Sequence, residues 1–334
     1  MNNSTLDDLL ESLRDRPAIT YIFTCIYAIG LITNALVIAV IVCRKNYRSS
    51  TYILIASMAT SDAFCCSCLI VYAVTSVYLL YPNSFTLEGR EFFCDFFGVT
   101  IYANYYISTH TLVIMSIDRY YAFVKPPFQA LLHTKRRLWI AIVLSWLLGF
   151  LVVLPQIHTG GIDSRFPYIC DAVNGHLIHS QIYFVCIVIF EEILPASIII
   201  YCYAHVVKAI KSSSDTMRTA SANSLNSNSL RTRHVAINKI IVITAVFLIL
   251  TAIIHITRMI ISLTDATVIN LYIRNASTLA SIINVFYGIA FLQPVVNPII
   301  FCILNKSFRR AIFRSTKADQ RANSHITLSN ITAA

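Results

Sequence analysis

Ionisable residues interrupt several long apolar stretches of this chain. Asp118 and Arg119 stand side by side at the end of one stretch, Asp62 lies inside another, and Glu191 and Glu192 are adjacent inside a third. Such residues are costly among apolar neighbours, and within a membrane they usually mark ion paths, proton relays or switches. The sequence therefore offers side chains that could form ion pairs, hold a cation or position a charged ligand.

The two adjacent glutamates have candidate partners further along the chain. His255 and Arg258, at positions i and i+3 of one apolar stretch, share a helix face. Because neighbours on a helix are 100° apart, Glu191 and Glu192 cannot both face lipid at low cost. Two hypotheses follow: these four residues line a ligand pocket, or they form an internal bridge between two helices.

The elements that position these residues are membrane-spanning helices. The chain has 334 residues, of which 57% are hydrophobic and 13% charged, whereas a soluble domain is about a quarter charged. Each apolar run reaches the ~20 residues that a helix needs to cross a bilayer. The predicted spans are residues 18–43, 52–80, 92–117, 138–157, 179–207, 235–263 and 276–303. The fold class is thus an all-α membrane protein with a bundle of seven transmembrane helices.

Basic residues predict the orientation of the bundle. Twenty of the 26 Lys and Arg residues fall on one side of the predicted spans and six on the other. The basic side is cytoplasmic by the positive-inside rule, which places the N-terminus outside and the C-terminus inside. The charge of +10 reflects this asymmetry and does not indicate nucleic-acid binding. Residues 1–17 contain no apolar core of a signal peptide and are predicted to be an extracellular tail.

Glycan and cysteine positions agree with this orientation. Glycosylation sequons begin at Asn2, Asn3 and Asn275, all on the predicted outside. Cys94 and Cys170 also fall outside, where the compartment is oxidising, and we predict that they form a disulfide. The other eight cysteines lie in or beside the spans, where Cys is mostly a small apolar residue.

Short motifs on successive spans resemble those of the rhodopsin-like (class A) G-protein-coupled receptors, over nearly the whole chain. Asp118-Arg119-Tyr120 ends the third span and "NPIIF" (297–301) ends the seventh, followed by "NKSFRRAIF", which resembles the short amphipathic eighth helix. The remaining matches are Gly30, Asn34 and Val37 in the first span, Asp62 in the second, Trp146 and Pro155 in the fourth, and Pro195 and Tyr203 in the fifth.

The resemblance implies a function and a switch. The protein would carry an extracellular signal across the plasma membrane to heterotrimeric G proteins, and it would be no enzyme itself. Activation would be a two-state equilibrium that an outside ligand biases. The residues implied in the G-protein switch are Asp118, Arg119, Tyr120, Tyr203, Asn297, Pro298 and Phe301.

The resemblance also implies a site for an allosteric sodium ion and no other cofactor. Its residues would be Asp62, Ser108, Gln293 and Asn297. The alternative is a hydrated polar network without a cation.

The ligand pocket would lie between the outer halves of the third, fifth, sixth and seventh helices. The residues that we assign to it are Ile101, Tyr102, Tyr105, Tyr106, Glu191, Glu192, His255, Arg258 and Tyr287. Ile101 stands where monoamine receptors carry an aspartate and Phe291 where opsins carry the retinal lysine, which argues against both ligand classes. "HITR" (255–258) faintly echoes receptors for nucleotides and lipids, and the ligand stays open.

Some residues depart from the family pattern. The sixth span has Thr251 and Ile253 where a Trp-x-Pro motif is usual, and Phe301 replaces a tyrosine. Arg233 stands where many relatives have an acid that pairs with the switch arginine, so we expect ligand-free signalling.

Two segments on the inner side complete the organisation. Residues 18–314 form the bundle with the eighth helix, and residues 315–334 form a flexible tail; residues 211–232, rich in Ser and Asn, are predicted to be a flexible linker. Both are candidate sites for receptor kinases and arrestin. Besides these partners and membrane lipids, two other functions stay possible: an ion channel or transporter, and a ligand-independent subunit of a heterodimer.

Overall fold

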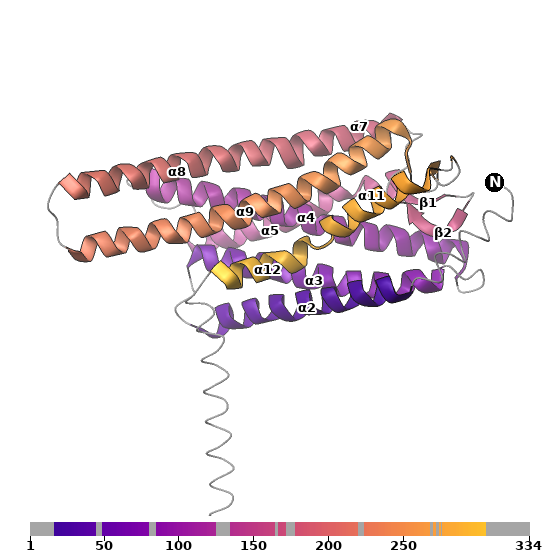
Figure 1. Ribbon diagram of the computed structural model, residues 1–334, viewed down its shortest axis with the longest axis horizontal. Coiled ribbons are helices and arrows are strands. Elements are labelled where there is room, and N and C mark those ends of the chain that lie inside the picture. Colours follow the sequence, from indigo (N-terminus) through magenta and orange to yellow (C-terminus); the bar gives the residue numbers. More distant parts are fainter. Residues whose placement is uncertain are drawn as a thin grey trace, which may run out of the picture.

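The chain folds into a bundle of long helices that run along one another, with a small β-hairpin at one end (Figure 1). The computed structural model describes residues 17–44, 49–79, 85–124, 134–163, 166–171, 178–219, 224–267, 270–271, 274 and 276–304. The predicted eighth helix, residues 1–16 of the N-terminal tail, the C-terminal tail and the sequon asparagines Asn2, Asn3 and Asn275 lie outside these residues.

Seven spans are present where the apolar runs predict them. The first five are α2 (Pro17–Cys43), α3 (Ser50–Leu79), α4 (Leu87–Val124), α5 (Lys135–Val153) and the continuous run α7 (Ile178–Ile187), η2 (Val188–Ile193) and α8 (Leu194–Thr219). The last two are α9 (Ser224–Thr264) and the pair α11 (Ser277–Ala290) and α12 (Gln293–Leu304). The short α6 (Gln156–Thr159) leads to strands β1 (Gly161–Asp163) and β2 (Phe166–Asp171).

By length and composition, five of these helices could cross a membrane, and α11 with α12 could form a sixth span bent by 43°. The long helix α4 packs against α3, α5 and α8, and many of its polar side chains are buried, so it has little surface left for lipid. The faces of the outer helices are apolar: Trp139, Leu147 and Leu151 on α5 are all exposed. This pattern is that of a bundle surrounded by lipid, with its polar residues inside.

One prediction about the connections is wrong. Residues 211–232 were expected to be a flexible linker, but α8 continues to Thr219 and α9 begins at Ser224. The segment contains neither Gly nor Pro, and extending an existing helix needs no new nucleus. Polar composition alone therefore did not end either helix.

Two close backbone contacts bring the helices together. A Cβ on Gly30 would come within 2.7 Å of Val295 on α12 and 2.8 Å of Cys66 on α3. A Cβ on Gly149 would meet the side chain of Ile107 at 2.5 Å, which fixes α5 against α4. Both positions require glycine for packing, because any larger side chain would push helices apart.

A disulfide joins the hairpin to the bundle. Cys94, near the start of α4, is bonded to Cys170 on β2, with 5.4 Å between their Cα atoms, which confirms the predicted pairing. We call this end of the bundle the hairpin end. Arg119, about seven turns of helix further along α4, marks the opposite end, which we call the Arg119 end.

Candidate functional site

Asp62 is the centre of a buried polar layer midway along the bundle. Its side chain is fully buried, and the amide of Asn104 on α4 donates to its Oδ1 at 3.0 Å, while the amide of Asn297 on α12 donates to its Oδ2 at 3.0 Å. The Asn104 amide also donates to Ser61 Oγ at 2.9 Å. Three helices are thus joined through one carboxylate.

Several oxygens around this layer have no hydrogen-bond partner among the described residues. These are the hydroxyl of Ser108, the side-chain carbonyl of Asn104 and the side-chain carbonyl of Gln293, all buried. Ser108 and Gln293 were predicted from the sequence to lie here, whereas Asn104 was missed. Asn104 precedes Ser108 by four residues, so helical spacing could have found it.

Two prolines in the last span leave two backbone carbonyls without their helical partner. Pro294 and Pro298 lack an N–H, so the carbonyls four residues earlier, of Ala290 and Pro294, lose a bond. The Tyr105 hydroxyl donates to Ala290 O at 3.0 Å, and the Asn34 amide donates to Pro294 O at 2.8 Å. Side chains from α4 and α2 therefore satisfy the free carbonyls and stabilise the break between α11 and α12.

At the Arg119 end, an ion pair and a cavity lie close to one another along α4. Nη2 of Arg119 contacts Oδ2 of the buried Asp118, and the Ser50 hydroxyl donates to the same oxygen at 3.4 Å. Between this pair and Asp62, a small cavity is lined mainly by apolar side chains. Phe301, Pro298 and Asn297 line it from α12, and Met58 and Leu112 from α3 and α4.

Tyr203 and Phe247 pack next to this cavity. Both are buried in one apolar cluster with Met58, Leu112 and Ile199. The Tyr203 hydroxyl has no hydrogen-bond partner among the described residues. Tyr120 lies apart from this cluster and packs its ring on Tyr201 and His205 of α8.

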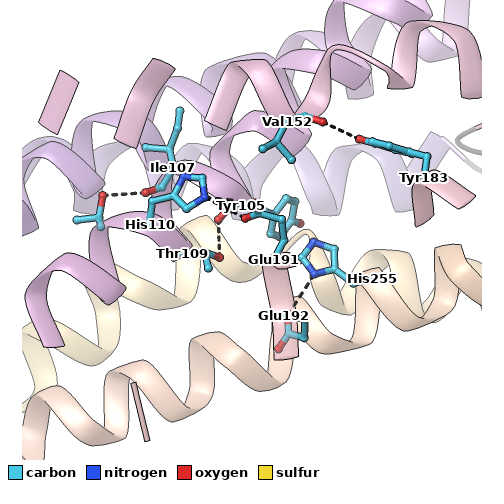
Figure 2. A network of polar contacts seen from close by, with 10 residues as sticks. Tyr105, Ile107, Thr109, His110, Val152, Tyr183, Glu191, Glu192 and His255 are labelled. Carbon is cyan, nitrogen blue, oxygen red and sulfur yellow. Dashed lines mark hydrogen bonds and ion pairs between the residues drawn. The ribbon is translucent and has the colours of Figure 1, made fainter. Parts of the chain in front are cut away.

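In the middle of the bundle, two carboxylates pair with two histidines (Figure 2). Glu191 contacts Nε2 of His110 on α4 at 3.1 Å, and Glu192 contacts Nδ1 of His255 on α9 at 3.2 Å. Both glutamates are buried and both lie in the π-helical turn η2. This wider turn presents the two adjacent side chains to two different helices, an arrangement that often marks a functional site.

The histidine of the second pair packs on a tyrosine. The rings of Tyr106 and His255 are nearly parallel, with 5.6 Å between their centroids. Tyr106 and His255 are both buried. Tyr183 on α7 ties the same region to α5, because its hydroxyl donates to Val152 O at 3.1 Å (Figure 2).

Arg258 lies one turn further along α9 and pairs with neither carboxylate. Its guanidinium carbon lies 3.8 Å from the ring centroid of Tyr102 and 4.5 Å from that of Phe184. The predicted cluster of Glu191, Glu192, His255 and Arg258 therefore divides into two Glu–His pairs and an arginine among aromatic rings. The sequence did not indicate His110, because on its own it is an ordinary polar residue of a long helix.

Comparison with known proteins decides the family. Residues 33–301 match the family described as 7 transmembrane receptor (rhodopsin family). The chain belongs to the rhodopsin-like receptors. It is also similar to galanin receptor type 1 of Homo sapiens, with 26% identity over 317 residues that cover 92% of this chain and 83% of that receptor.

The receptor therefore signals through heterotrimeric G proteins, and its polar sites can be read in that light. The residues assigned to the switch lie on α4, α8 and α12 toward the Arg119 end. Of those assigned to the ligand pocket, Ile101, Tyr102 and Tyr106 are all buried in the middle of α4. Tyr105 has a structural bond to α11, so its hydroxyl serves the fold as well as any ligand.

Proposed function

We propose that the receptor lies in the plasma membrane. The hairpin end then faces the extracellular space, and the Arg119 end faces the cytoplasm. Most Lys and Arg residues fall on the side of the predicted spans that carries Arg119, and basic loops mark the cytoplasmic side. The Cys94–Cys170 disulfide at the other end suits an oxidising compartment. A ligand would then arrive at the hairpin end and a G protein at the Arg119 end.

The observation that carries the switch proposal is the contact between Arg119 and Asp118. The carboxylate of Asp118 is almost completely buried and also accepts a bond from Ser50 on α3. In this arrangement Arg119 is engaged by its own helix and not extended toward a partner. We assign it to the resting state, in which the arginine is held until a ligand shifts the equilibrium.

The cavity beside Phe301 would let side chains of α9 and α12 repack when the active state forms. It lies among α2, α3, α4, α9 and α12 and is lined mainly by apolar side chains, so repacking there breaks few hydrogen bonds. Movement of α9 and α12 would free Arg119 to receive the G protein. Agonist and G protein would stabilise the same state, and each would raise the affinity of the other by the same factor.

Two substitutions at the Asp118–Arg119 pair test this switch. Arg119→Ala should abolish nucleotide exchange on the G protein, and Asp118→Asn should raise ligand-free exchange because it weakens the hold on the arginine. Arg137→Ala, an exposed arginine at the start of α5, is the matched control. Exchange is measured across a panel of G proteins at equal receptor amounts. Unchanged exchange in Arg119→Ala, or a fall in Asp118→Asn, would contradict the proposal.

We also propose that the Asp62 layer holds a sodium ion. Asn104, Asn297 and Gln293 surround the Asp62 carboxylate, Ser108 follows Asn104 by one helical turn, and the side-chain oxygens of Ser108, Asn104 and Gln293 have no hydrogen-bond partner among the described residues. Hard cations prefer such oxygen ligands. A bound cation would balance the buried carboxylate and stabilise the state in which α3, α4 and α12 converge on it.

Sodium binding can be tested without an agonist. The unfolding temperature of the purified receptor should be higher in NaCl than in KCl at the same ionic strength. The difference should be about 2–4 °C for each kcal/mol of stabilisation by bound sodium. Asp62→Asn should remove the difference, and Asp95→Asn, at a partly exposed acid of α4, should keep it. Equal unfolding temperatures of the parent in both salts would show that no such site operates.

Other partners follow from the receptor class. We propose that the receptor promotes nucleotide exchange on its G protein and carries out no covalent reaction itself. We further propose that receptor kinases modify the Ser- and Thr-rich segments 211–232 and 315–334, and that arrestin binds them afterwards through the added negative charge.

A further inference from the structure

Arg258 is the most isolated charge in the described part of the chain. Its side chain is fully buried, and Nε, Nη1 and Nη2 all lack a hydrogen-bond partner among the described residues. A guanidinium carries five N–H donors and no acceptor. Leaving all of them unused in a buried place is strongly unfavourable, because a buried charge needs a partner.

The nearby acids do not supply that partner. Glu191 is engaged by His110 and Glu192 by His255, and no described carboxylate lies within ion-pair distance of Arg258. The rings of Tyr102 and Phe184 attract the cation, but a ring face accepts no strong hydrogen bond. Cation–π contacts of this kind contribute only part of what a desolvated ion loses.

An apolar cluster covers the arginine toward the hairpin end. Phe184 of α7 packs there with Ile261 of α9, Leu271, and Ala280 and Ile283 of α11. All five side chains are buried and none is charged. A ligand that reaches Arg258 beside this cluster would therefore need an acidic group for the arginine and an apolar or aromatic body for the cluster.

We propose that Arg258 binds the acidic group of the receptor's ligand, a carboxylate or a phosphate, and that the ligand's apolar body lies among Tyr102, Phe184 and the cluster that covers them. This inference rests on the proposed entry of the ligand from the hairpin end. The planar fork of the guanidinium matches either acid in a bidentate contact. The aromatic rings hold the fork in place before the ligand arrives.

The first test uses the receptor without any ligand. Arg258→Met keeps the apolar length of the side chain and removes the charge. If the arginine is kept for a ligand, thermal unfolding of Arg258→Met should occur at the same temperature as in the parent or above it, because binding residues are often retained against stability. Arg274→Met is the control, since Arg274 is exposed and lies 3.6 Å from Asp265. A fall of several degrees in Arg258→Met, beyond that of the control, would show a structural arginine and overturn the proposal.

The second test uses pairs of probes that differ only in charge. Dodecanoate and 3-phenylpropionate are each compared with their amides, and dodecyl phosphate and phenyl phosphate extend the comparison to phosphates, at constant ionic strength. An acid at several times its Kd should raise the unfolding temperature of the parent by about 2–4 °C. The rise should be lost in Arg258→Met and kept in Arg274→Met. Carboxylates and phosphates are scored separately, which identifies the acid.

The outcomes separate this inference from the switch proposal. If no acid stabilises the parent more than its neutral counterpart, or if the gain persists in Arg258→Met, the anion site is refuted while nucleotide exchange through Arg119 is unaffected. If Arg119→Ala leaves exchange unchanged but acids still stabilise the parent through Arg258, the switch proposal fails and the anion site stands.

Discussion

The two ends of the bundle are held together in different ways. At the hairpin end a disulfide joins α4 to β2, and further along α4, in the middle of the bundle, two Glu–His pairs and stacked aromatic rings join α4, η2 and α9. At the Arg119 end, the described polar contacts at the centre are the Asp118–Arg119 pair and its bond from Ser50, beside a largely apolar cavity. The Asp62 layer meets α4 at Asn104, between Cys94 and His110.

This difference fits a receptor that receives at one end and moves at the other. Directional and covalent contacts preorganise the hairpin end, so little binding free energy is lost in ordering it when a ligand binds. The Arg119 end depends on non-directional packing that can be exchanged for other packing at low cost. Elements that move are expected to come from the less stable part of a structure. The comparison therefore predicts large effects on stability from substitutions at the hairpin end and small effects on stability near Arg119.

The largest effect is expected from the disulfide. Cys94→Ser opens a link that spans 76 residues of sequence, and loss of such a bond typically costs about 2–5 kcal/mol. We expect a strong fall in the amount of receptor at the cell surface. Cys186→Ser, at an exposed free cysteine of α7, is the control and should have little effect. Normal surface delivery and stability of Cys94→Ser would show that the hairpin end does not depend on this link.

The next effect is expected at the break between α11 and α12. Tyr105→Phe removes the hydroxyl that donates to Ala290 O and leaves a buried carbonyl unsatisfied, which costs about 1–3 kcal/mol. The loss of stability is measured as the fall in the unfolding temperature of the purified receptor. Tyr21→Phe, at a tyrosine that is 69% exposed, controls for loss of a hydroxyl in general. Equal stability of both variants would mean that another group satisfies the carbonyl.

A smaller effect is expected from the coupling within each Glu–His pair. Double-mutant cycles on stability with Glu192→Gln and His255→Ala, and with Glu191→Gln and His110→Ala, should give interaction energies of about 0.5–3 kcal/mol. The crossed cycle of Glu191→Gln with His255→Ala should be additive within about 0.3–0.5 kcal/mol. Coupling in the crossed cycle as strong as in the direct ones would show a single cluster in place of two pairs.

Periodic and short-range patterns predicted much of this molecule. The seven apolar runs, the Cys94–Cys170 bond and the convergence of Asp62 with Asn297 all follow from sequence spacing and motif resemblance. These features depend on which residue types stand at which helical positions, and a sequence states that directly.

The partners of Glu191 and Arg258 could not be read in the same way. The π-helical turn changes which face each glutamate presents, and the two adjacent carboxylates contact two different helices. Nothing in "VIFEEI" indicates the wider turn before the neighbouring helices are in place. The predicted bridge between the fifth and sixth spans is present as the Glu192–His255 pair, whereas the pairing of Glu191 with His110 and the separate position of Arg258 were not predicted.

The smallest effect, and the last prediction, concerns the ligand-free state at the Arg119 end. In many relatives of this family an acid near the inner end of the sixth helix pairs with the switch arginine, whereas this chain has Arg233 in α9. The side chain of Arg233 lies outside the described residues, so the argument rests on sequence position. Two cations 4 Å apart repel by about 4 kcal/mol at an effective dielectric of 20, and exposure reduces this to roughly 1 kcal/mol or less. That still shifts a two-state ratio about fivefold.

Arg233→Glu should therefore lower ligand-free nucleotide exchange, because it offers Arg119 a second carboxylate besides Asp118. The opposing influence is the loss of the usual proline in α9 and the Phe301 substitution, which make the active state harder to reach; we judge the missing acid to be the stronger term. Exchange is plotted against surface expression for the parent and for Arg233→Glu, with Arg233→Gln as the variant that removes repulsion without adding a partner. The expected order is parent, then Arg233→Gln, then Arg233→Glu. A parent without ligand-free exchange on any G protein, or a rise in Arg233→Glu, would contradict the prediction and would mean that Asp118 alone holds the switch.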